Sequence, residues 1–126
     1  MFKVIQTEKA PAAIGPYSQA LISGNMLFAS GQIPLNPENG QLVEGDIKIQ
    51  ATQVMKNISA ILEAAGVGFE NVIKTTCFLK NMEDFAAFNE IYAQYFTGKP
   101  ARSCVAASKL PKDVSCEVEI IAILPQ

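Results

Sequence analysis

The 126-residue chain contains no histidine. Histidine is the commonest general base near neutral pH, the central member of Ser-His and Cys-His nucleophilic systems, and the metal ligand of HExxH sites. All of these arrangements are therefore excluded. Any chemistry that the chain performs has to depend on carboxylates, hydroxyls, backbone amides, arginine and water.

Cysteine is scarce, and its spacing matches no metal or disulfide motif. Cys77, Cys104 and Cys116 are odd in number and form no CxxC pair. The sequence therefore indicates neither a disulfide framework nor a tetrahedral zinc site. We expect reduced thiols, no metal and no cofactor.

Long hydrophobic runs and clusters of positive charge are also missing. The longest apolar run falls far short of a membrane span, and no signal core follows the N-terminal residues. The ten basic residues are scattered singly, the net charge is -2, and no cationic stripe could follow a phosphate backbone. These absences argue against membrane and nucleic-acid partners. They predict a cytoplasmic protein, although an organellar precursor without its presequence would have the same sequence.

The residues that are present predict one folded domain over 1–126. Hydrophobic residues make up 49% of the chain and charged residues 17%, which excludes a disordered chain. A chain of this length can bury one substantial core but not two.

The N-terminal half reads as strands followed by a helix. Residues 1–6 predict a strand, and residues 18–23 and 26–30 predict a hairpin around the two-residue turn Gly24-Asn25. Asp46 can cap a helix that ends at Gly66. Its apolar residues recur at steps of three and four: Ile47, Ala51, Val54, Ile58, Ile61, Leu62 and Ala65.

The C-terminal half adds a strand, a helix and two strands. Residues 72–79 are rich in β-branched and aromatic residues and predict a strand. Asn81 can cap a second amphipathic helix that ends before Gly98. Strands are then expected over residues 103–107 and 115–124. The order β, ββ, α, β, α, ββ predicts an α+β fold with two helices on one face of a mixed or mostly antiparallel sheet.

The last predicted strand is apolar on both sides. Ile120 and Ala122 alternate with Ile121 and Ile123, but two helices can cover only one face of the sheet. The second face needs another cover. Oligomerisation is the economical explanation, and the pattern alone indicates only that the protein is not a monomer.

Arg102 is the most informative charged residue. It lies in Pro-Ala-Arg-Ser-Cys-Val among small and apolar neighbours, and Glu117 and Glu119 follow on one face of the last strand. A planar guanidinium in such a setting predicts an anionic ligand. A structural salt bridge between Arg102 and a nearby acid is the alternative.

Four separated blocks occur in an order that resembles the Rid family, the reactive intermediate deaminases also called the YjgF family. They are APAAIGPYSQ, ASGQIP, VIKTTCFLKNMEDFAAFNEIYAQYF, and PARSCV with its following LPKDV. The similarity runs from the first residues to the last strand and is greatest to the RidA-type enamine/imine deaminases.

The resemblance implies a chorismate-mutase-like fold and a homotrimer, in which sheets surround a central barrel and ligand clefts lie between subunits. It also implies hydrolysis of 2-aminoacrylate, 2-iminopropanoate and 2-iminobutanoate to 2-oxo acids and ammonia. The alternatives are a trimer that binds 2-oxo acids for regulation without turnover, and the endoribonuclease or translation inhibitor after which the family is sometimes named. The charge and the lack of histidine do not favour the last.

The matched motifs also imply roles for individual residues. Arg102 would bind the substrate carboxylate through its forked pair of donors. Glu117 matches the cleft glutamate that would hold the attacking water. Glu119 is the competing candidate, because side chains two residues apart in a strand lie on the same face. The catalytic set is completed by Tyr17 and Ser30.

Three further residues are implied in substrate binding. Gly31 would contribute its backbone amide, and Asn89 would line the cleft from the second helix. Cys104 lacks a histidine partner, so we expect its backbone N–H, and not its thiol, to bind the ligand.

Overall fold

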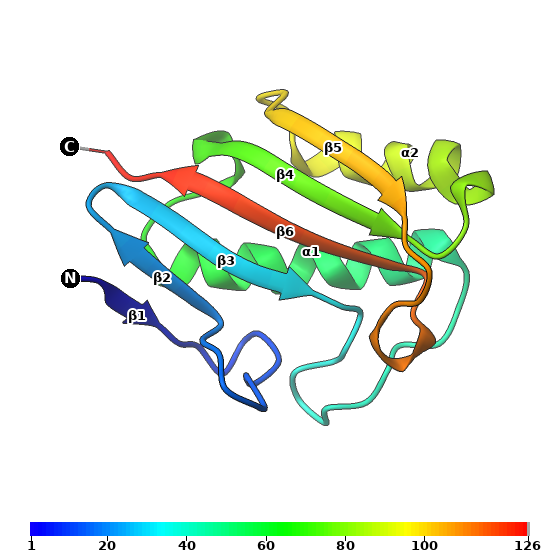
Figure 1. Ribbon diagram of the computed structural model, residues 1–126, viewed down its shortest axis with the longest axis horizontal. Coiled ribbons are helices and arrows are strands. Elements are labelled where there is room, and N and C mark those ends of the chain that lie inside the picture. Colours follow the sequence, from blue (N-terminus) through cyan, green and yellow to red (C-terminus); the bar gives the residue numbers. More distant parts are fainter. Residues whose placement is uncertain (126) are drawn as a thin grey trace.

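Two helices cover one face of a six-stranded sheet in the computed structural model, which describes residues 1–125 (Figure 1). The strand order is β1-β2-β3-β6-β4-β5, and only β4 and β5 run parallel. The predicted α+β fold with a mixed sheet is confirmed. The elements are β1 (Lys3–Ile5), β2 (Ala20–Ser23), β3 (Met26–Gln32), α1 (Ile47–Ala64), β4 (Val72–Leu79), α2 (Phe85–Tyr95), β5 (Ala101–Ala106) and β6 (Cys116–Ile123).

Helix α1 begins where the sequence predicts. The Asp46 side chain accepts a hydrogen bond from the Ile49 backbone N–H at 3.0 Å, which satisfies one of the free donors of the first turn. Gly66 follows the helix with φ of +80°, a conformation that glycine adopts without steric cost. The predicted apolar stripe is buried against the sheet.

Helix α2 differs from the prediction at its start. Asn81 precedes a short 3₁₀ turn, Met82–Asp84, and the α-helix itself begins at Phe85. The side chain of Asn81 makes no capping hydrogen bond, because the tighter turn uses backbone bonding instead, with the Asp84 N–H donating to the Asn81 carbonyl at 3.1 Å. The helix ends at Tyr95, before Gly98.

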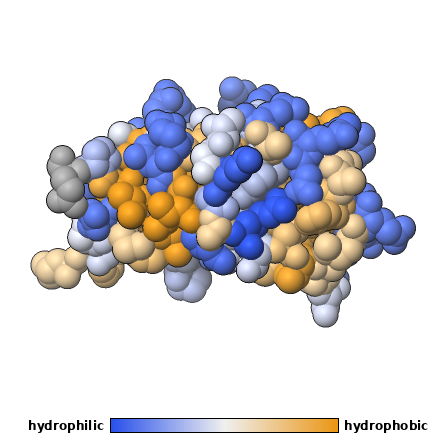
Figure 2. Space-filling model, turned by 90° about the horizontal axis from the view of Figure 1, so that it is seen from above, coloured by the Kyte–Doolittle hydropathy of each residue, from blue (hydrophilic) through white to orange (hydrophobic). Residues whose placement is uncertain are grey.

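Strand β6 has the alternation that the sequence indicates. Cys116, Val118, Ile120 and Ala122 are buried beneath the helices, whereas the intervening residues point to the other face. That face leaves Phe28, Val105 and Ile123 between 39% and 49% exposed. Figure 2 shows the molecule from above, at the edge where β5 and α2 lie uppermost in Figure 1, and there too hydrophobic side chains gather on both sides of a hydrophilic band. A single chain therefore leaves apolar surface uncovered on the sheet.

No helix within residues 1–125 combines the length and the apolar character needed to cross a membrane.

Candidate functional site

Arg102 lies on β5, an edge strand, and its guanidinium rests against α2. Its Nη1 donates a hydrogen bond to Asn89 Oδ1 at 2.7 Å. The guanidinium carbon lies 4.6 Å from the centre of the Tyr92 ring and 5.4 Å from that of Phe85, distances that suit cation–π attraction. Asn89 is thus placed beside Arg102, as a partner of the guanidinium.

No carboxylate pairs with Arg102 within residues 1–125. The ion pairs there are Lys9 with Glu63, Lys48 with Glu90, and Lys80 with Asp113. The structural salt bridge considered for Arg102 is therefore wrong for the single chain. Asn89 and the aromatic rings fix the guanidinium in place without neutralising its charge.

A hollow of about 490 Å³ opens beside this arginine. Its walls come from α2, the connection to β5 and the start of β5: Asn89, Tyr92, Ala93, Phe96, Thr97, Lys99, Pro100 and Arg102. The lining is largely apolar apart from the two cations and the polar groups of Asn89 and Thr97. An anion with a short carbon chain fits this chemistry.

Glu117 lies on the open face of the sheet, next to an irregularity in β3. The register between β3 and β6 shifts between Ala29 and Gln32, and this β-bulge turns Gly31 toward Glu117. A methyl group on Gly31 would come within 2.9 Å of Glu117 Cδ and would collide with the carboxylate. A side chain at position 31 would therefore have to displace the carboxylate of Glu117 from its place over the strand.

Burial distinguishes Glu117 from Glu119. Glu117 is half-buried, whereas Glu119 is exposed. Burial, and to a smaller extent the negative charge of Glu119, raises the pKa of Glu117 above its ordinary value. A carboxylate with a raised pKa is a stronger base, which suits a role in accepting a proton.

Ser30 joins β3 to the loop that carries Tyr17. The Ser30 hydroxyl donates to the Ser18 carbonyl at 2.6 Å, and the Ser30 N–H donates to the Gln19 carbonyl at 2.9 Å. The Ser30 hydroxyl hydrogen is thus used in a hydrogen bond to the backbone, and the hydroxyl oxygen can still accept a hydrogen bond. Tyr17 is 53% exposed and borders a hollow that also contains Ser30 and Glu119.

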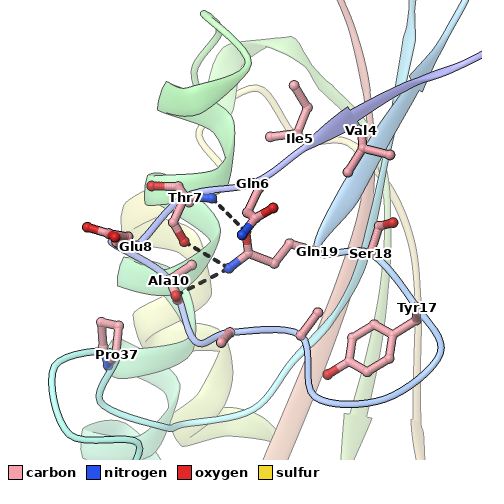
Figure 3. Close-up of a pocket in the computed structure, with 12 residues that line it drawn as sticks. Val4, Ile5, Gln6, Thr7, Glu8, Ala10, Tyr17, Ser18, Gln19 and Pro37 are labelled. Atoms are coloured by element: carbon pink, nitrogen blue, oxygen red, sulfur yellow. Dashed lines mark hydrogen bonds between the residues drawn. The ribbon is translucent and has the colours of Figure 1, made fainter.

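Gln19 anchors this loop and was missed by sequence reasoning. Its amide nitrogen donates to the carbonyls of Thr7, Ala10 and Pro11, and its oxygen accepts from the Thr7 N–H at 2.7 Å. Figure 3 shows the side chain pointing into the bend of the loop, beside a hollow of about 580 Å³. In the sequence, Gln19 is only a single glutamine next to a predicted strand, a residue type that is usually exposed. Its burial becomes evident only from the fold.

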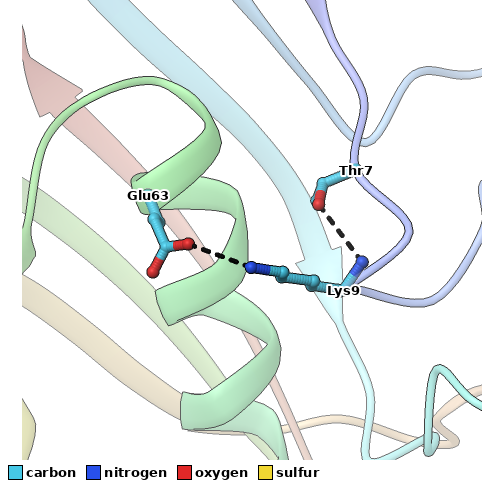
Figure 4. A network of polar contacts seen from close by, with 3 residues as sticks. All are labelled: Thr7, Lys9 and Glu63. Atoms are coloured by element: carbon cyan, nitrogen blue, oxygen red, sulfur yellow. Dashed lines mark hydrogen bonds and ion pairs between the residues drawn. The ribbon is translucent and has the colours of Figure 1, made fainter.

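The same loop has a weaker tie to α1. Lys9 Nζ lies 3.4 Å from Glu63 Oε1, and the Lys9 N–H donates to the Thr7 hydroxyl at 3.1 Å (Figure 4). The side chains of Lys9 and Glu63 are 76% and 73% exposed, so solvent screens the pair and it adds little stability. Gln19 is the main anchor of the loop.

The three thiols lie in surroundings that keep them protonated. Burial raises the pKa of Cys77 and of Cys116 to about 12. Burial also raises the pKa of Cys104, against the opposing effects of the Arg102 charge and a hydrogen bond from Cys77. Because the thiolate is the nucleophilic form, this setting does not activate Cys104.

The predicted site residues form two groups on opposite faces of the sheet. Arg102 and Cys104 are in register with Thr75 and Cys77, which are buried on the helix side. Glu117 is in register with Phe78 on the other side. On the open face, Gly31 adjoins Glu117, whereas Tyr17 and Ser30 border a hollow that contains Glu119. On the helix side, Asn89 and Cys104 accompany Arg102. One chain does not bring the two groups together.

Residues 1–125 contain no group of three or more histidine, cysteine, aspartate or glutamate side chains that could hold a metal ion. The chemical groups available are an unpaired guanidinium, a half-buried carboxylate, hydroxyls and backbone amides.

Comparison with known proteins identifies the family. The family described as Endoribonuclease L-PSP, to which the YjgF and Rid proteins belong, matches residues 7–124. A 2-iminobutanoate/2-iminopropanoate deaminase from Escherichia coli is 50% identical over 127 aligned residues, which cover 98% of each chain. The chain belongs to the Rid family. A RutC family protein from Pyrococcus horikoshii is 58% identical, covering 97% of this chain and 98% of the relative.

A solved structure extends the similarity from sequence to fold. The crystal structure of E. coli TdcF with bound serine is 44% identical, covers 98% of this Rid chain and 99% of its own, and has a TM-score of 0.92. That relative holds a small molecule with a carboxylate. The family resemblance read from the four sequence blocks is therefore confirmed, together with the fold of the single chain.

Proposed function

We propose that this Rid protein hydrolyses short 2-imino acids, 2-iminopropanoate and 2-iminobutanoate with their enamine tautomers, to 2-oxo acids and ammonia. The observation that carries the proposal is the Arg102 guanidinium, which is held by Asn89 and two rings but meets no carboxylate within residues 1–125. The deaminase name of the E. coli relative supplies the reaction class.

The proposed chemistry needs only positioning and one proton acceptor. Arg102 binds the substrate carboxylate through two donors. Glu117 holds a water and accepts its proton as the water oxygen bonds to the imine carbon. That proton passes to the nitrogen, which gives a carbinolamine. The carbinolamine hydroxyl then loses its proton to Glu117, which passes it to the nitrogen as the C–N bond breaks, so that ammonia leaves and the carbon becomes the carbonyl of the 2-oxo acid. Fixing the reactants together accelerates a reaction that already occurs in water.

Ser30 and Tyr17 have complementary parts in this scheme. Because the Ser30 hydroxyl donates its hydrogen bond to the Ser18 carbonyl, its oxygen remains free to accept a hydrogen bond from the N–H of the imine. Tyr17 brings a phenolic hydroxyl on the loop that Gln19 anchors. The backbone amides of Gly31 and Cys104 are the proposed additional ligand donors.

The two half-sites are proposed to meet between subunits of a homotrimer with a central barrel. Arg102 and Glu117 lie on opposite faces of the sheet within one chain, so a complete site requires a second chain. The exposed Phe28, Val105 and Ile123 supply apolar surface for the contact.

The direct test replaces Arg102 and measures ammonia release from freshly generated 2-iminobutanoate. Arg102→Ala should lose about a hundredfold or more in kcat/KM, because the lost contact is a paired, charge-assisted one. Arg102→Lys should recover little, since an ammonium cannot fork. Full activity of Arg102→Lys would contradict the bidentate role, and full activity of Arg102→Ala would overturn the proposed function.

A regulatory role without turnover is the second candidate, and the serine bound to TdcF favours considering it. Both candidates require Arg102 for ligand binding. Only the deaminase releases ammonia faster than the uncatalysed reaction, so the same assay separates them. Intrinsic RNA cleavage would instead persist in a pure protein and disappear in Arg102→Ala.

A further inference from the structure

One stripe of α2 faces the arginine of β5. Phe85, Asn89 and Tyr92 are spaced by four and three residues, which places them on the same side of the helix. All three contact the Arg102 guanidinium, through two rings and one carbonyl oxygen. The helix thus presents a surface to a side chain that the sequence assigned to ligand binding.

Tyr92 is the most strongly fixed member of this stripe. Its hydroxyl and that of Thr75 are 2.8 Å apart, and both residues are buried. Its ring stacks on Phe96 with centres 4.5 Å apart and also contacts Phe88 at 5.9 Å. The ring therefore has little freedom to turn.

Thr75 connects the ring to the strand that carries the arginine. Thr75 lies on β4, directly in register with Arg102 on β5. Thr75 thus restrains the backbone of Arg102 through strand pairing. It also restrains the Tyr92 ring through the hydrogen bond between the two hydroxyls. Three contacts therefore form a ring: Thr75 on β4 bonds to Tyr92 on α2, the Tyr92 ring packs on the Arg102 guanidinium, and Arg102 on β5 pairs with Thr75 in the sheet.

We infer that Tyr92 is a positioning residue, whose ring holds the Arg102 guanidinium in one plane for the ligand carboxylate. The inference rests on the proposed role of Arg102. Two parallel N–H bonds require the guanidinium plane to match that of the carboxylate. An arginine on an edge strand would otherwise populate many rotamers, and ordering them would weaken binding. The Tyr92 ring restricts the plane before the ligand arrives.

The test compares Tyr92→Leu with Tyr92→Phe, and uses Tyr95→Leu as the matched control. Tyr95 lies one turn along the same helix and packs on Phe69 instead of Arg102. Tyr92→Leu should raise the Kd for 2-oxobutyrate and the KM for the imine about tenfold, with a smaller change in kcat, because the cation–π surface is lost. Tyr92→Phe keeps the ring, so both constants should stay within about twofold, although Thr75 loses its partner and stability falls. Tyr95→Leu should leave both constants near those of the parent.

A spectroscopic measurement keeps the test independent of activity. A guanidinium over an aromatic ring experiences its ring current, so the Arg102 Nε–H resonance should lie upfield in the parent and in Tyr92→Phe. Loss of that shift in Tyr92→Phe, or an unshifted parent resonance, would overturn the inference even if Tyr92→Leu does not fold. Unchanged constants in folded Tyr92→Leu would overturn it as well. A failure of the proposed function can be distinguished from a failure of this inference, because the former would show itself as full deaminase activity in Arg102→Ala.

Discussion

At the scale of single residues, Glu117 and Glu119 show how burial separates two side chains that alternation makes equivalent. Both lie on the open face of β6, but only Glu117 is half-buried and placed over Gly31. The bulge in β3 produces this difference, since it brings the glycine backbone under one carboxylate. The geometry supports Glu117 as the proposed proton acceptor.

The pH dependence of turnover should reflect the environment of Glu117. Its raised pKa means that the carboxylate is protonated, and inactive as a base, at a higher pH than an ordinary glutamate. The acidic limb of kcat/KM should therefore lie above the ordinary glutamate range. In Glu119→Gln that limb should move to lower pH, because one cause of the shift, the neighbouring negative charge, is removed.

Glu117→Gln is the matched comparison for this pH profile. It keeps the shape of the side chain but removes its basicity, so kcat should fall much more than the affinity for 2-oxobutyrate. Glu119→Gln should change neither to a comparable extent at neutral pH. If the two phenotypes were reversed, the water-holding role would belong to Glu119.

At the scale of elements, the two predicted helix caps differ in what they contribute. Asp46 caps α1 through a side-chain bond, whereas Asn81 precedes a 3₁₀ turn that is held by backbone bonds. Both residues are typical of N-caps, so the local sequence does not distinguish them. The distinction arises because the chain has to turn from the end of β4 into α2 within a few residues.

This difference predicts unequal effects of two matched substitutions. Asp46→Ala removes the bond to the Ile49 N–H and should lower the free energy of unfolding by about 1 kcal/mol. Asn81→Ala removes no side-chain cap and should cost about half of that or less. Denaturant unfolding monitored by circular dichroism measures both, and a larger loss in Asn81→Ala would contradict the assigned capping.

At the scale of the whole molecule, the fold divides the proposed site between two faces of one sheet. Arg102 rests against α2, and Glu117 lies on the face that carries exposed Phe28 and Ile123. The apolar open face and the divided site have the same explanation in the proposed trimer. A subunit that covers the face also supplies the missing half of each site.

Mixed assemblies test this arrangement directly. Arg102→Ala and Glu117→Gln proteins should each be inactive alone. When the two are unfolded, mixed in equal amounts and refolded together, about a quarter of the sites should receive an intact Arg102 from one chain and an intact Glu117 from another, and activity should return in proportion. Refolding each variant separately before mixing is the control. Well-formed mixed trimers without recovered activity would rule out the shared site, as would an active monomer in light scattering.

The sequence by itself determined the features that depend on near neighbours along the chain. The alternation of β6 and the apolar stripe of α1 follow from local periods of two and 3.6 residues. The turn at Gly24-Asn25 follows from residues that adopt positive φ. The four motif blocks likewise identified the family, because they are linear patterns. The absence of histidine excluded whole classes of mechanism without any coordinates.

Only the tertiary structure decided which side chains meet. Tyr92 and Thr75 were unremarkable in sequence, and the placement of α2 over β5 puts both beside Arg102. Gln19 became an anchor because the loop of residues 7–11 bends around it. Such contacts join residues far apart in the chain, so their geometry depends on the packing of whole elements, which no local period encodes.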